Sequence, residues 1–222
     1  MKHLKIYLTY LIFGLLCSGH AMAIEEPKYE VIQVDGPFEI RHYAPILIAE
    51  TMIEGDMDEA SNKGFRLIAD FIFGNNQVPN SSENSRIAMT APVTMEPVST
   101  KIAMTAPVTI EPQSTESNAD IQMVKRWRIH FVMPSQFTLT NIPKPKNNAV
   151  TLREVPSKFF LVHTYSGFNT LARVKSKTDE AIAWANRKSL KVMSSPQLSR
   201  YDPPWTLPMF RRNEIMVEIS AP

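Results

Sequence analysis

Histidine is the side chain in this sequence with the clearest capacity for chemistry, because a neutral imidazole binds metal ions and takes up a proton near neutral pH. His42, His130 and His163 stand in three separate segments in which apolar and polar residues alternate. No two of them have the short spacing that is typical of a structural zinc site, so a zinc centre would require three distant segments to converge. The sequence therefore does not favour a metal site built from protein side chains alone.

His42 is the first candidate ligand. In the alternating segment Phe38–Tyr43 it shares a face with Phe38 and Ile40, because every second residue of a strand points the same way. An imidazole beside two apolar groups suits the axial ligand of a metal held in apolar surroundings. The alternative is a histidine at the end of a strand that bonds to the backbone.

The other two histidines are weaker candidates. His163 shares its face with Phe159 and Leu161 and is the second choice. His130 projects away from the face that carries Ile129 and Phe131, and such a position favours a structural or solvent-exposed role.

Motifs of common catalytic sites are absent from the sequence. It contains no Gly-x-Ser-x-Gly, no phosphate-binding glycine loop and no His-Glu-x-x-His, and its seven glycines leave few such loops to build. We therefore assign no catalytic residue and expect a binding protein rather than an enzyme.

The first 23 residues are expected to be an export signal. Basic residues in Met1–Lys5 precede the apolar run Ile6–Leu16, and Ala21–Ala23 has the small residues of a cleavage site. The mature chain would begin at Ile24 and reach the periplasm or the outside of the cell. The apolar run is short for a membrane span, and its removal would also remove Cys17, the only cysteine.

Without the signal, the chain has almost no net charge. Loss of Lys2 and Lys5 brings the 24 basic residues down to 22, which is also the number of acidic residues. A neutral chain without a long basic cluster is not expected to bind nucleic acid. Residues 24–222 are long enough to bury one hydrophobic core, so we expect a single domain without a transmembrane helix.

The hydrophobic pattern predicts the same order of elements twice. In the first half, strands are predicted at Tyr29–Val34, Phe38–Tyr43 and Pro45–Ile53, followed by Gly55 and an amphipathic helix at Met57–Phe73. A strand predicted at Lys125–Met133 follows this helix and completes the first half. The second half repeats the order, with strands predicted at Val150–Val155 and Lys158–Tyr165, then Gly167, a helix from Thr170 to Leu190 and a strand at Asn213–Ile219. The segment after Pro196 is predicted to be irregular. Two halves that pack sheet against sheet, each with one helix, make an α+β domain.

One octapeptide, Ile-Ala-Met-Thr-Ala-Pro-Val-Thr, occurs at residues 87–94 and again at residues 102–109. Its alternation predicts a strand, and Pro92 and Pro107 place that strand at an edge or a bulge because proline cannot donate to a sheet. A repeat of 15 residues is too short for a helical or propeller architecture, and no third copy exists. We interpret the second copy as a duplicated edge strand, so that either copy can fill one position in the sheet.

Four separated motifs resemble the SOUL haem-binding protein family. They are Phe38-Glu39-Ile40-Arg41-His42-Tyr43-Ala44-Pro45, the helix that contains Gly64-Phe65, the Lys-Ile-Ala-Met-Thr-Ala-Pro-Val of residues 101–108, and Tyr201-Asp202-Pro203-Pro204-Trp205 with Arg211-Arg212-Asn213-Glu214. The octapeptide is itself a family motif, and its second copy is a departure from the family. The resemblance implies an α+β fold with distorted, barrel-like antiparallel or mixed sheets in two pseudo-symmetric halves, similar to gyrase-inhibitor-like effector-binding domains.

The resemblance also implies a non-covalently bound haem or related tetrapyrrole. His42 lies in the family motif whose histidine is a proposed axial ligand, although some members hold haem without one. Met89 and Met104, inside the octapeptides, would line the pocket or ligate the iron. Arg41 would pair with the porphyrin propionates or remain solvated at the surface.

The function that follows is an exported haem carrier or buffer. One alternative is a module that binds another small hydrophobic ligand or a protein partner, with haem binding incidental. A small-molecule hydrolase that uses the same cleft is the less favoured alternative.

Overall fold

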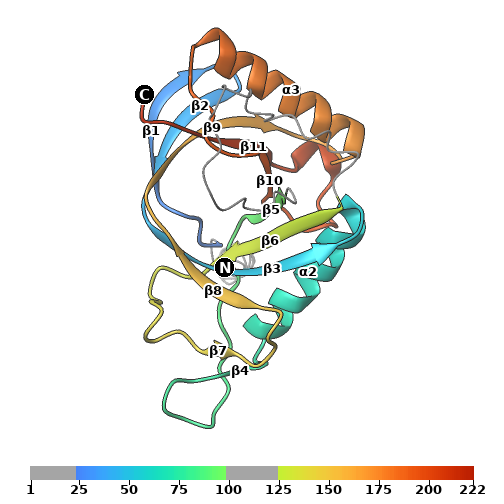
Figure 1. The fold of residues 1–222 in the computed structure, drawn as a ribbon. Helices are drawn as coiled ribbons and strands as arrows, with labels where there is room; N and C mark the ends of the chain where they lie inside the picture. Colours follow the sequence, from blue (N-terminus) through green and yellow to red (C-terminus); the bar gives the residue numbers. More distant parts are fainter. Residues whose placement is uncertain (1–23, 99–124) are drawn as a thin grey trace, which may run out of the picture.

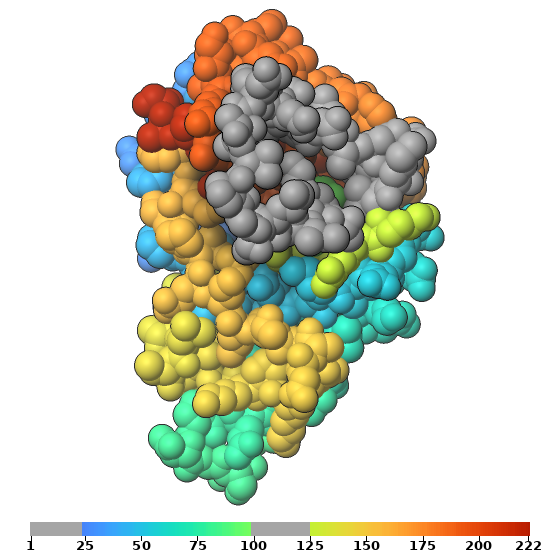
Figure 2. All heavy atoms as spheres, viewed as in Figure 1, coloured from blue at the N-terminus to red at the C-terminus, as the bar shows by residue number. Residues whose placement is uncertain are grey.

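The structure is a computed structural model that describes residues 24–98 and 125–222. Its main sheet curls into a half-barrel, and two long helices lie on the outer side of the curl (Figure 1). The loop that follows the first of these helices projects beyond one end of the sheet, at the lower end of the space-filling view (Figure 2). The expected α+β fold is confirmed.

Nine strands of the described chain form the main sheet, and every neighbouring pair is antiparallel. Their order in space is β1 (Tyr29–Asp35), β2 (Phe38–Tyr43), β9 (Lys158–Tyr165), β11 (Asn213–Ile219), β10 (Gln197–Arg200), β5 (Val93–Pro97), β6 (Arg126–Val132), β3 (Ile46–Glu54) and β8 (Thr151–Val155). A small separate sheet pairs β4 (Asn76–Gln77) with β7 (Lys144–Pro145).

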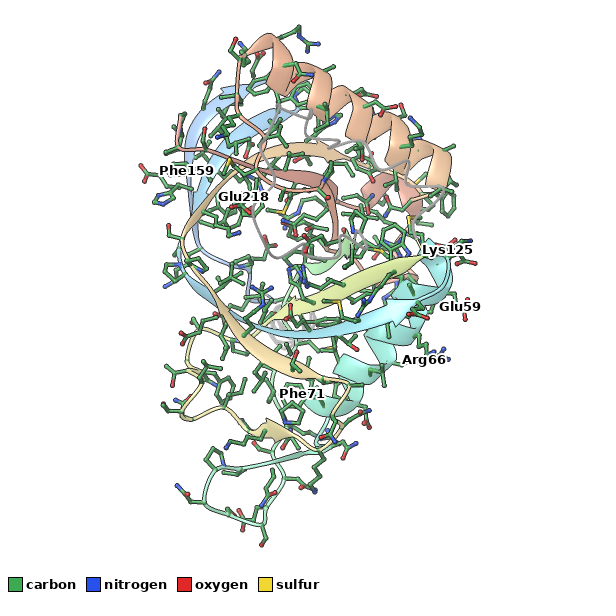
Figure 3. All side chains as sticks on the ribbon, viewed as in Figure 1. Glu59, Arg66, Phe71, Lys125, Phe159 and Glu218 are labelled. Atoms are coloured by element: carbon green, nitrogen blue, oxygen red, sulfur yellow. The ribbon has the colours of Figure 1, made fainter. Side chains whose placement is uncertain are left out.

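The first helix, α2 (Met57–Ile72), packs against β3 and β6. Asp56 caps its N-terminus, because its carboxylate accepts a hydrogen bond from the backbone N–H of Glu59 at 2.8 Å. Phe71 is buried on the side of the helix that faces the sheet, whereas Glu59 and Arg66 project outward (Figure 3). The 3.6-residue period thus buries one face of the helix, as the sequence predicts.

Gly64 sets the distance between α2 and the sheet. A Cβ atom at this position would lie 2.8 Å from both Cβ and Cγ1 of Ile129 on β6, which is closer than packed carbon atoms approach. Ile129 is itself fully buried. The backbone of the helix therefore rests directly on the side chain of the strand.

The second helix, α3 (Leu171–Arg187), packs against β9 and β11. The Thr170 hydroxyl caps its N-terminus by accepting a hydrogen bond from the backbone N–H of Arg173 at 3.3 Å. Near the other end, Trp184 stacks on Phe38 of β2, with 5.4 Å between the ring centroids. This helix covers the second half of the sheet in the way that α2 covers the first.

The two faces of the curled sheet carry different side chains. The outer face and the helices enclose the main hydrophobic core, which includes Leu47, Ile129, Phe131, Leu161 and Val217. The inner face carries a smaller apolar cluster of Tyr43, Phe160, Val162 and Met216 together with several charged residues. Because strand residues alternate between faces, a central strand such as β9 contributes to both environments, with Leu161 in the main core and Phe160 in the inner cluster.

The predicted repetition of two halves is confirmed, but the prediction that they pack sheet against sheet was wrong, because β10 pairs with β5 and joins both halves into one continuous sheet. The elements β3, α2, β5 and β6 correspond to β9, α3, β10 and β11. Outward from the β10–β5 pair, the order β11, β9, β2 is matched by β6, β3, β8, and β1 is an additional strand at one edge. Gly55 (φ +134°) and Gly167 (φ +109°) precede the two helices at equivalent places. Trp127 donates to the carbonyl of Gly55 at 3.2 Å, and Asn213 donates to the carbonyl of Gly167 at 3.1 Å. Side chains from equivalent strands therefore hold both turns.

The prediction of an edge strand over residues 87–94 was wrong for most of that range, and β5 lies inside the sheet, between β10 and β6. The strand β5 begins only at Val93, after a cis peptide bond between Ala91 and Pro92. Before it, the Thr90 hydroxyl donates to the carbonyl of Val132. The backbone of this segment pairs with Glu25 instead of with a neighbouring strand, since the N–H of Ala91 donates to the carbonyl of Glu25 at 2.9 Å. The second octapeptide, at residues 102–109, lies outside the described residues.

The segment after Pro196, predicted to be irregular, contains the short strand β10. It pairs on one side with β11 and on the other with β5, so it joins the two halves of the sheet. Across residues 24–98 and 125–222, neither helix combines the length and the apolar composition that a membrane crossing requires.

Candidate functional site

A pocket of about 170 Å³ lies on the inner side of the half-barrel. Strands from both halves of the sheet line it, so neither half forms it alone. Part of its wall is apolar and consists of Ile46, Ile48, Val132, Val155, Phe160 and Met216. Charged and polar side chains complete the wall, a combination that is typical of ligand pockets.

His130 lines this pocket from the middle of β6. It stands opposite Glu50 on β3 and Thr94 on β5. Its Nδ1 atom is buried and has no hydrogen-bond partner among the residues that the structure describes. Burial lowers the pKa of His130 to about 4, with Arg153 and Arg128 acting in the same direction and Glu50 against them. The ring is therefore neutral at pH 7, and one of its nitrogens keeps a free electron pair.

Glu50 holds two arginines at the pocket. Its carboxylate accepts two hydrogen bonds from Arg153, at 3.0 and 2.9 Å, and lies 3.3 Å from Nε of Arg128. Arg128 also donates to Glu96 at 2.9 Å. Burial acts against ionisation of Glu50, but the hydrogen bonds from Arg153 and the two positive charges keep its pKa below the usual value. Two guanidinium groups therefore lie beside a neutral imidazole.

The second half of the sheet contributes another ion pair to the pocket. Nζ of Lys158 on β9 lies 2.5 Å from Oε2 of Glu218 on β11, and both side chains line the pocket. Glu218 lies on the inner side of the half-barrel, whereas Phe159 points outward from the same region (Figure 3). The charged wall thus extends across both halves.

Arg41 is buried on the inner face, although it does not line the pocket. Its Nη1 lies 3.1 Å from each carboxylate oxygen of Glu214 and 3.1 Å from the hydroxyl of Tyr43, and its Nε donates to Glu39 at 2.6 Å. Burial disfavours its charge, but the Glu214 carboxylate more than compensates and raises its pKa. With these partners, Arg41 supports the pocket from behind through Tyr43, which does line it.

His42 lies on the opposite face of the sheet from the pocket. Its ring stacks on Phe159, with 4.3 Å between the centroids, and its Nε2 lies 2.6 Å from Oγ of Ser157. The Ser157 hydroxyl donates its one proton to the carbonyl of Tyr43 at 2.9 Å. Nε2 of His42 is therefore the donor to Ser157, and its Nδ1 keeps the electron pair.

The remaining residues singled out from the sequence do not gather at the pocket. His163 is buried against α3, where its Nδ1 lies 3.2 Å from the carbonyl oxygen of Lys177, and burial lowers its pKa. Met89 is partly exposed and does not line the pocket. Met104 lies outside the described residues. Within the described chain, no three His, Cys, Asp or Glu side chains gather closely enough to hold a metal ion.

Sequence reasoning missed the place of His130 in the pocket. The available signal was Glu50, a carboxylate inside an otherwise apolar strand, together with the alternation of Arg128 and His130 on one face of β6. Charges on the same face of neighbouring strands indicate a polar interior. The pattern does not specify toward which face the sheet curls, so it could not show that this face is concave.

The sequence matches the family model described as "SOUL heme-binding protein" over residues 24–100 and again over residues 96–218. A segment of 86 residues is 37% identical to "Heme-binding protein 2" from Homo sapiens. That match covers 36% of this chain and 40% of the human protein, so it spans less than half of the relative's length.

Solved structures share the fold. The C-terminal domain of EcmrR matches with a TM-score of 0.57 at 11% identity, over 87% of this chain and 99% of that chain. An uncharacterised conserved protein from Listeria innocua matches with a TM-score of 0.50 at 9% identity, over 94% of this chain and 98% of that chain. Likeness at such low identity shows the fold alone. The family model, however, extends from residue 24 to residue 218, and the chain therefore belongs to the SOUL family.

Proposed function

We propose that this protein binds haem or a related tetrapyrrole in the pocket inside the half-barrel. The description of its family and the name of its human relative support this ligand class. The observation that leads to a particular site is the buried Nδ1 of His130, which has no hydrogen-bond partner among the described residues and belongs to a ring that lines a partly apolar pocket.

The residues of the pocket suit the chemistry of haem. A neutral imidazole is a common axial ligand to haem iron, and the low pKa of His130 keeps its ring neutral. Ile48, Val132 and other apolar side chains offer contact to a porphyrin ring. Arg128 and Arg153 pair with Glu50 and Glu96 in this structure, and they would bind propionate carboxylates by sharing or exchanging these partners. Bound iron would supply a Lewis acid, and His130 would be its ligand from the protein.

The pocket is smaller than the ligand that we propose for it. Its volume of about 170 Å³ is below the roughly 300–1,000 Å³ of typical ligand pockets, so a tetrapyrrole enters only in part or the pocket widens. The only cysteine, Cys17, precedes the domain, and residues 24–222 therefore contain no thiol for a thioether link to haem. We infer a carrier or buffer that holds its ligand non-covalently and releases it.

The expected export signal would bring this carrier to the periplasm or the outside of the cell. Mass spectrometry of the protein recovered from cell fractions tests this point. A mass that corresponds to a chain starting at Ile24, found outside the cytoplasm, is the expected result. An uncleaved cytoplasmic chain would contradict export without affecting the proposed ligand.

A hemin titration tests ligand and site together. Wild-type protein should bind one hemin saturably with a shifted Soret band. His130→Ala should change the band and weaken binding, because the iron loses its protein ligand. His42→Ala is the matched control, since it removes a histidine from the outer face of the same sheet, and it should leave the spectrum unchanged.

Three outcomes would contradict parts of the proposal. Non-saturating absorption with the wild-type protein would exclude specific tetrapyrrole binding. A changed spectrum in His42→Ala with an unchanged one in His130→Ala would place the ligand on the outer face. Iron-free protoporphyrin that binds as tightly as hemin would show that no side chain ligates the iron. Unfolding midpoints of each variant distinguish lost ligation from lost folding.

We also infer that binding occurs without catalysis, since the pocket histidine has no hydroxyl or thiol nucleophile bonded to it among the described residues. A panel of small esters tests this inference. Turnover above the buffer rate that disappears in His130→Ala would support a hydrolase instead.

A further inference from the structure

Five large apolar side chains form an exposed cluster next to the N-terminus of α3, and none of them lines the pocket. All five are between 58% and 82% exposed: Phe168, Trp205, Leu207, Met209 and Phe210. The turn before α3 and the loop between β10 and β11 meet here, because the N–H of Gly167 donates to the carbonyl of Pro208 at 2.9 Å. We call these five residues the apolar cluster.

The loop that carries most of the cluster is held open by its own hydrogen bonds. Arg211 donates to the carbonyl oxygens of Thr206, at 2.8 Å, and Pro204. The short 3₁₀ helix η2 (Pro208–Phe210) follows, and its proline further restricts the backbone. Since the backbone is already fixed, the apolar side chains remain in solvent and little ordering is needed when they meet a partner.

Trp205 shows how unusual this exposure is within the molecule. The other two tryptophans, Trp127 and Trp184, are buried, whereas Trp205 is 82% exposed. Soluble proteins rarely expose a contiguous group of large apolar side chains, because their contact with water is unfavourable. Such a group therefore often marks an interaction site. The cluster is therefore best explained by a partner that covers it.

Two arginines, Arg173 and Arg211, lie beside the apolar cluster. Residues 166–178 and 203–213 contain no acidic side chain. Arg173 and Arg211 donate to backbone carbonyl oxygens, Arg173 to Ser166 at 3.0 Å, so these bonds leave their charges unneutralised. Arg211 also lies over the ring of Phe168, 5.3 Å from its centroid. The partner should therefore offer an apolar region to the five side chains and negative charge to the two arginines beside them.

We propose that the apolar cluster docks this protein on the surface of an anionic lipid bilayer. Tryptophan and phenylalanine favour the boundary between head groups and acyl chains, and arginines beside them attract anionic head groups. A second copy of this chain fits less well, because a twofold interface would bring the same arginines of both copies together. Docking would place a ligand carrier next to a membrane, but it does not depend on which ligand the pocket holds.

Tryptophan fluorescence tests the proposal on the full chain, because Trp205 is the one exposed tryptophan of the three. Vesicles of phosphatidylcholine mixed with phosphatidylglycerol should shift the emission to the blue. Lipids brominated on their acyl chains should quench it. Vesicles of phosphatidylcholine alone should bind more weakly, and added salt should weaken binding to the anionic vesicles.

Two sets of variants assign the signal. Trp205→Phe should abolish the blue shift and retain vesicle binding. The double variant Trp205→Ser with Phe210→Ser should lower co-sedimentation with anionic vesicles by about tenfold. Val34→Ser with Phe73→Ser is the matched control, since it removes two side chains that are 63% and 56% exposed elsewhere. All variants keep residues 1–23, so any binding by that apolar run is the same in each.

Unchanged co-sedimentation of the double variant would overturn the proposal, as would equal binding to both kinds of vesicle. Sedimentation velocity without lipid provides the remaining comparison. Dimerisation that disappears in the double variant would identify a second copy as the occupant in place of a bilayer.

Discussion

Glu50 and His130 stand directly opposite each other on the neighbouring strands β3 and β6, inside the half-barrel. Arg153 and Arg128 stabilise the ionised form of Glu50, whereas burial and the same two arginines disfavour a proton on His130. An ionised carboxylate and a neutral imidazole therefore lie side by side. Burial is the main reason that His130 is neutral, and the two arginines are the reason that Glu50 stays ionised beside it.

The free energy of unfolding should fall as the pH decreases from about 6.5 to about 4. The pKa of His130 is 6.5 in the unfolded chain and about 4 in the folded one, so in this range the unfolded chain binds a proton that the folded chain does not. Above pH 6.5 neither state is protonated and the effect disappears. The loss should reach at most about 3 kcal/mol near pH 4.

Denaturant unfolding at several pH values measures this dependence, and His130→Gln isolates the contribution of one side chain. The variant should lose less stability on acidification than the wild-type protein. Two parallel pH profiles would show that His130 titrates normally in the folded state.

Glu50→Gln should destabilise the fold, because it removes the charge that both Arg128 and Arg153 share. The expected cost is about 1–2 kcal/mol, at the lower end for charged hydrogen bonds since water reaches part of Arg153. Glu54→Gln, an exposed position on the same strand, is the matched control and should be neutral. Equal unfolding midpoints for the two variants would mean that the Glu50 network contributes no stability.

The elements that the sequence predicted well have unambiguous local signals. The strands β2 and β11 have the predicted bounds. Apolar and polar residues alternate in both strands, and β2 also has the turn Asp35-Gly36-Pro37 before it and Pro45 after it. Both helices begin where a capping side chain, Asp56 or Thr170, precedes an apolar face of 3.6-residue period. Such signals depend only on residues that are close in sequence, so they can be recognised without the tertiary structure.

The elements that failed depend on distant partners. The strand β10 is short, and its pairing with β5 and β11 defines it more than its composition does. The residues before Val93 alternate like a strand, yet their backbone forms only an isolated bridge with Glu25, which is distant in sequence. The candidate site was ambiguous for a related reason, since alternation separates His42 from Arg41 but does not say which of the two faces becomes the pocket.

Gly64→Ala should destabilise the protein although alanine favours helix. The added methyl group would lie 2.8 Å from two carbon atoms of Ile129, and overpacking of this kind costs about 1–3 kcal/mol. Alanine gains about 1 kcal/mol in helix propensity over glycine, so the net loss is smaller than the steric cost. Asn62→Ala, on the exposed side of the same helix, should be slightly stabilising, and thermal unfolding compares the two. A stabilised Gly64→Ala would show that α2 can move away from β6 at little cost.

Deletion of residues 101–112 should leave the fold intact, because the first octapeptide copy and the residues after it supply β5. Met95 of this strand is buried in the main core, and Oγ1 of Thr94 lies 2.9 Å from Oγ of Ser199 on β10. In the deletion variant, Met95→Ala should cost about 2–5 kcal/mol.

The same substitution in the full chain tests whether the copies exchange. Ile110 follows Met95 by 15 residues and occupies the equivalent position of the repeat. If the second copy can fill the place of the first, residues around Ile110 can form the strand in the full chain. Met95→Ala should then lower the free energy of unfolding less in the full chain than in the deletion variant, which lacks the second copy. Equal costs in both chains would show that the strand position belongs to the first copy alone. A deletion variant without a cooperative unfolding transition would show the reverse, namely that the second copy is the one the sheet requires.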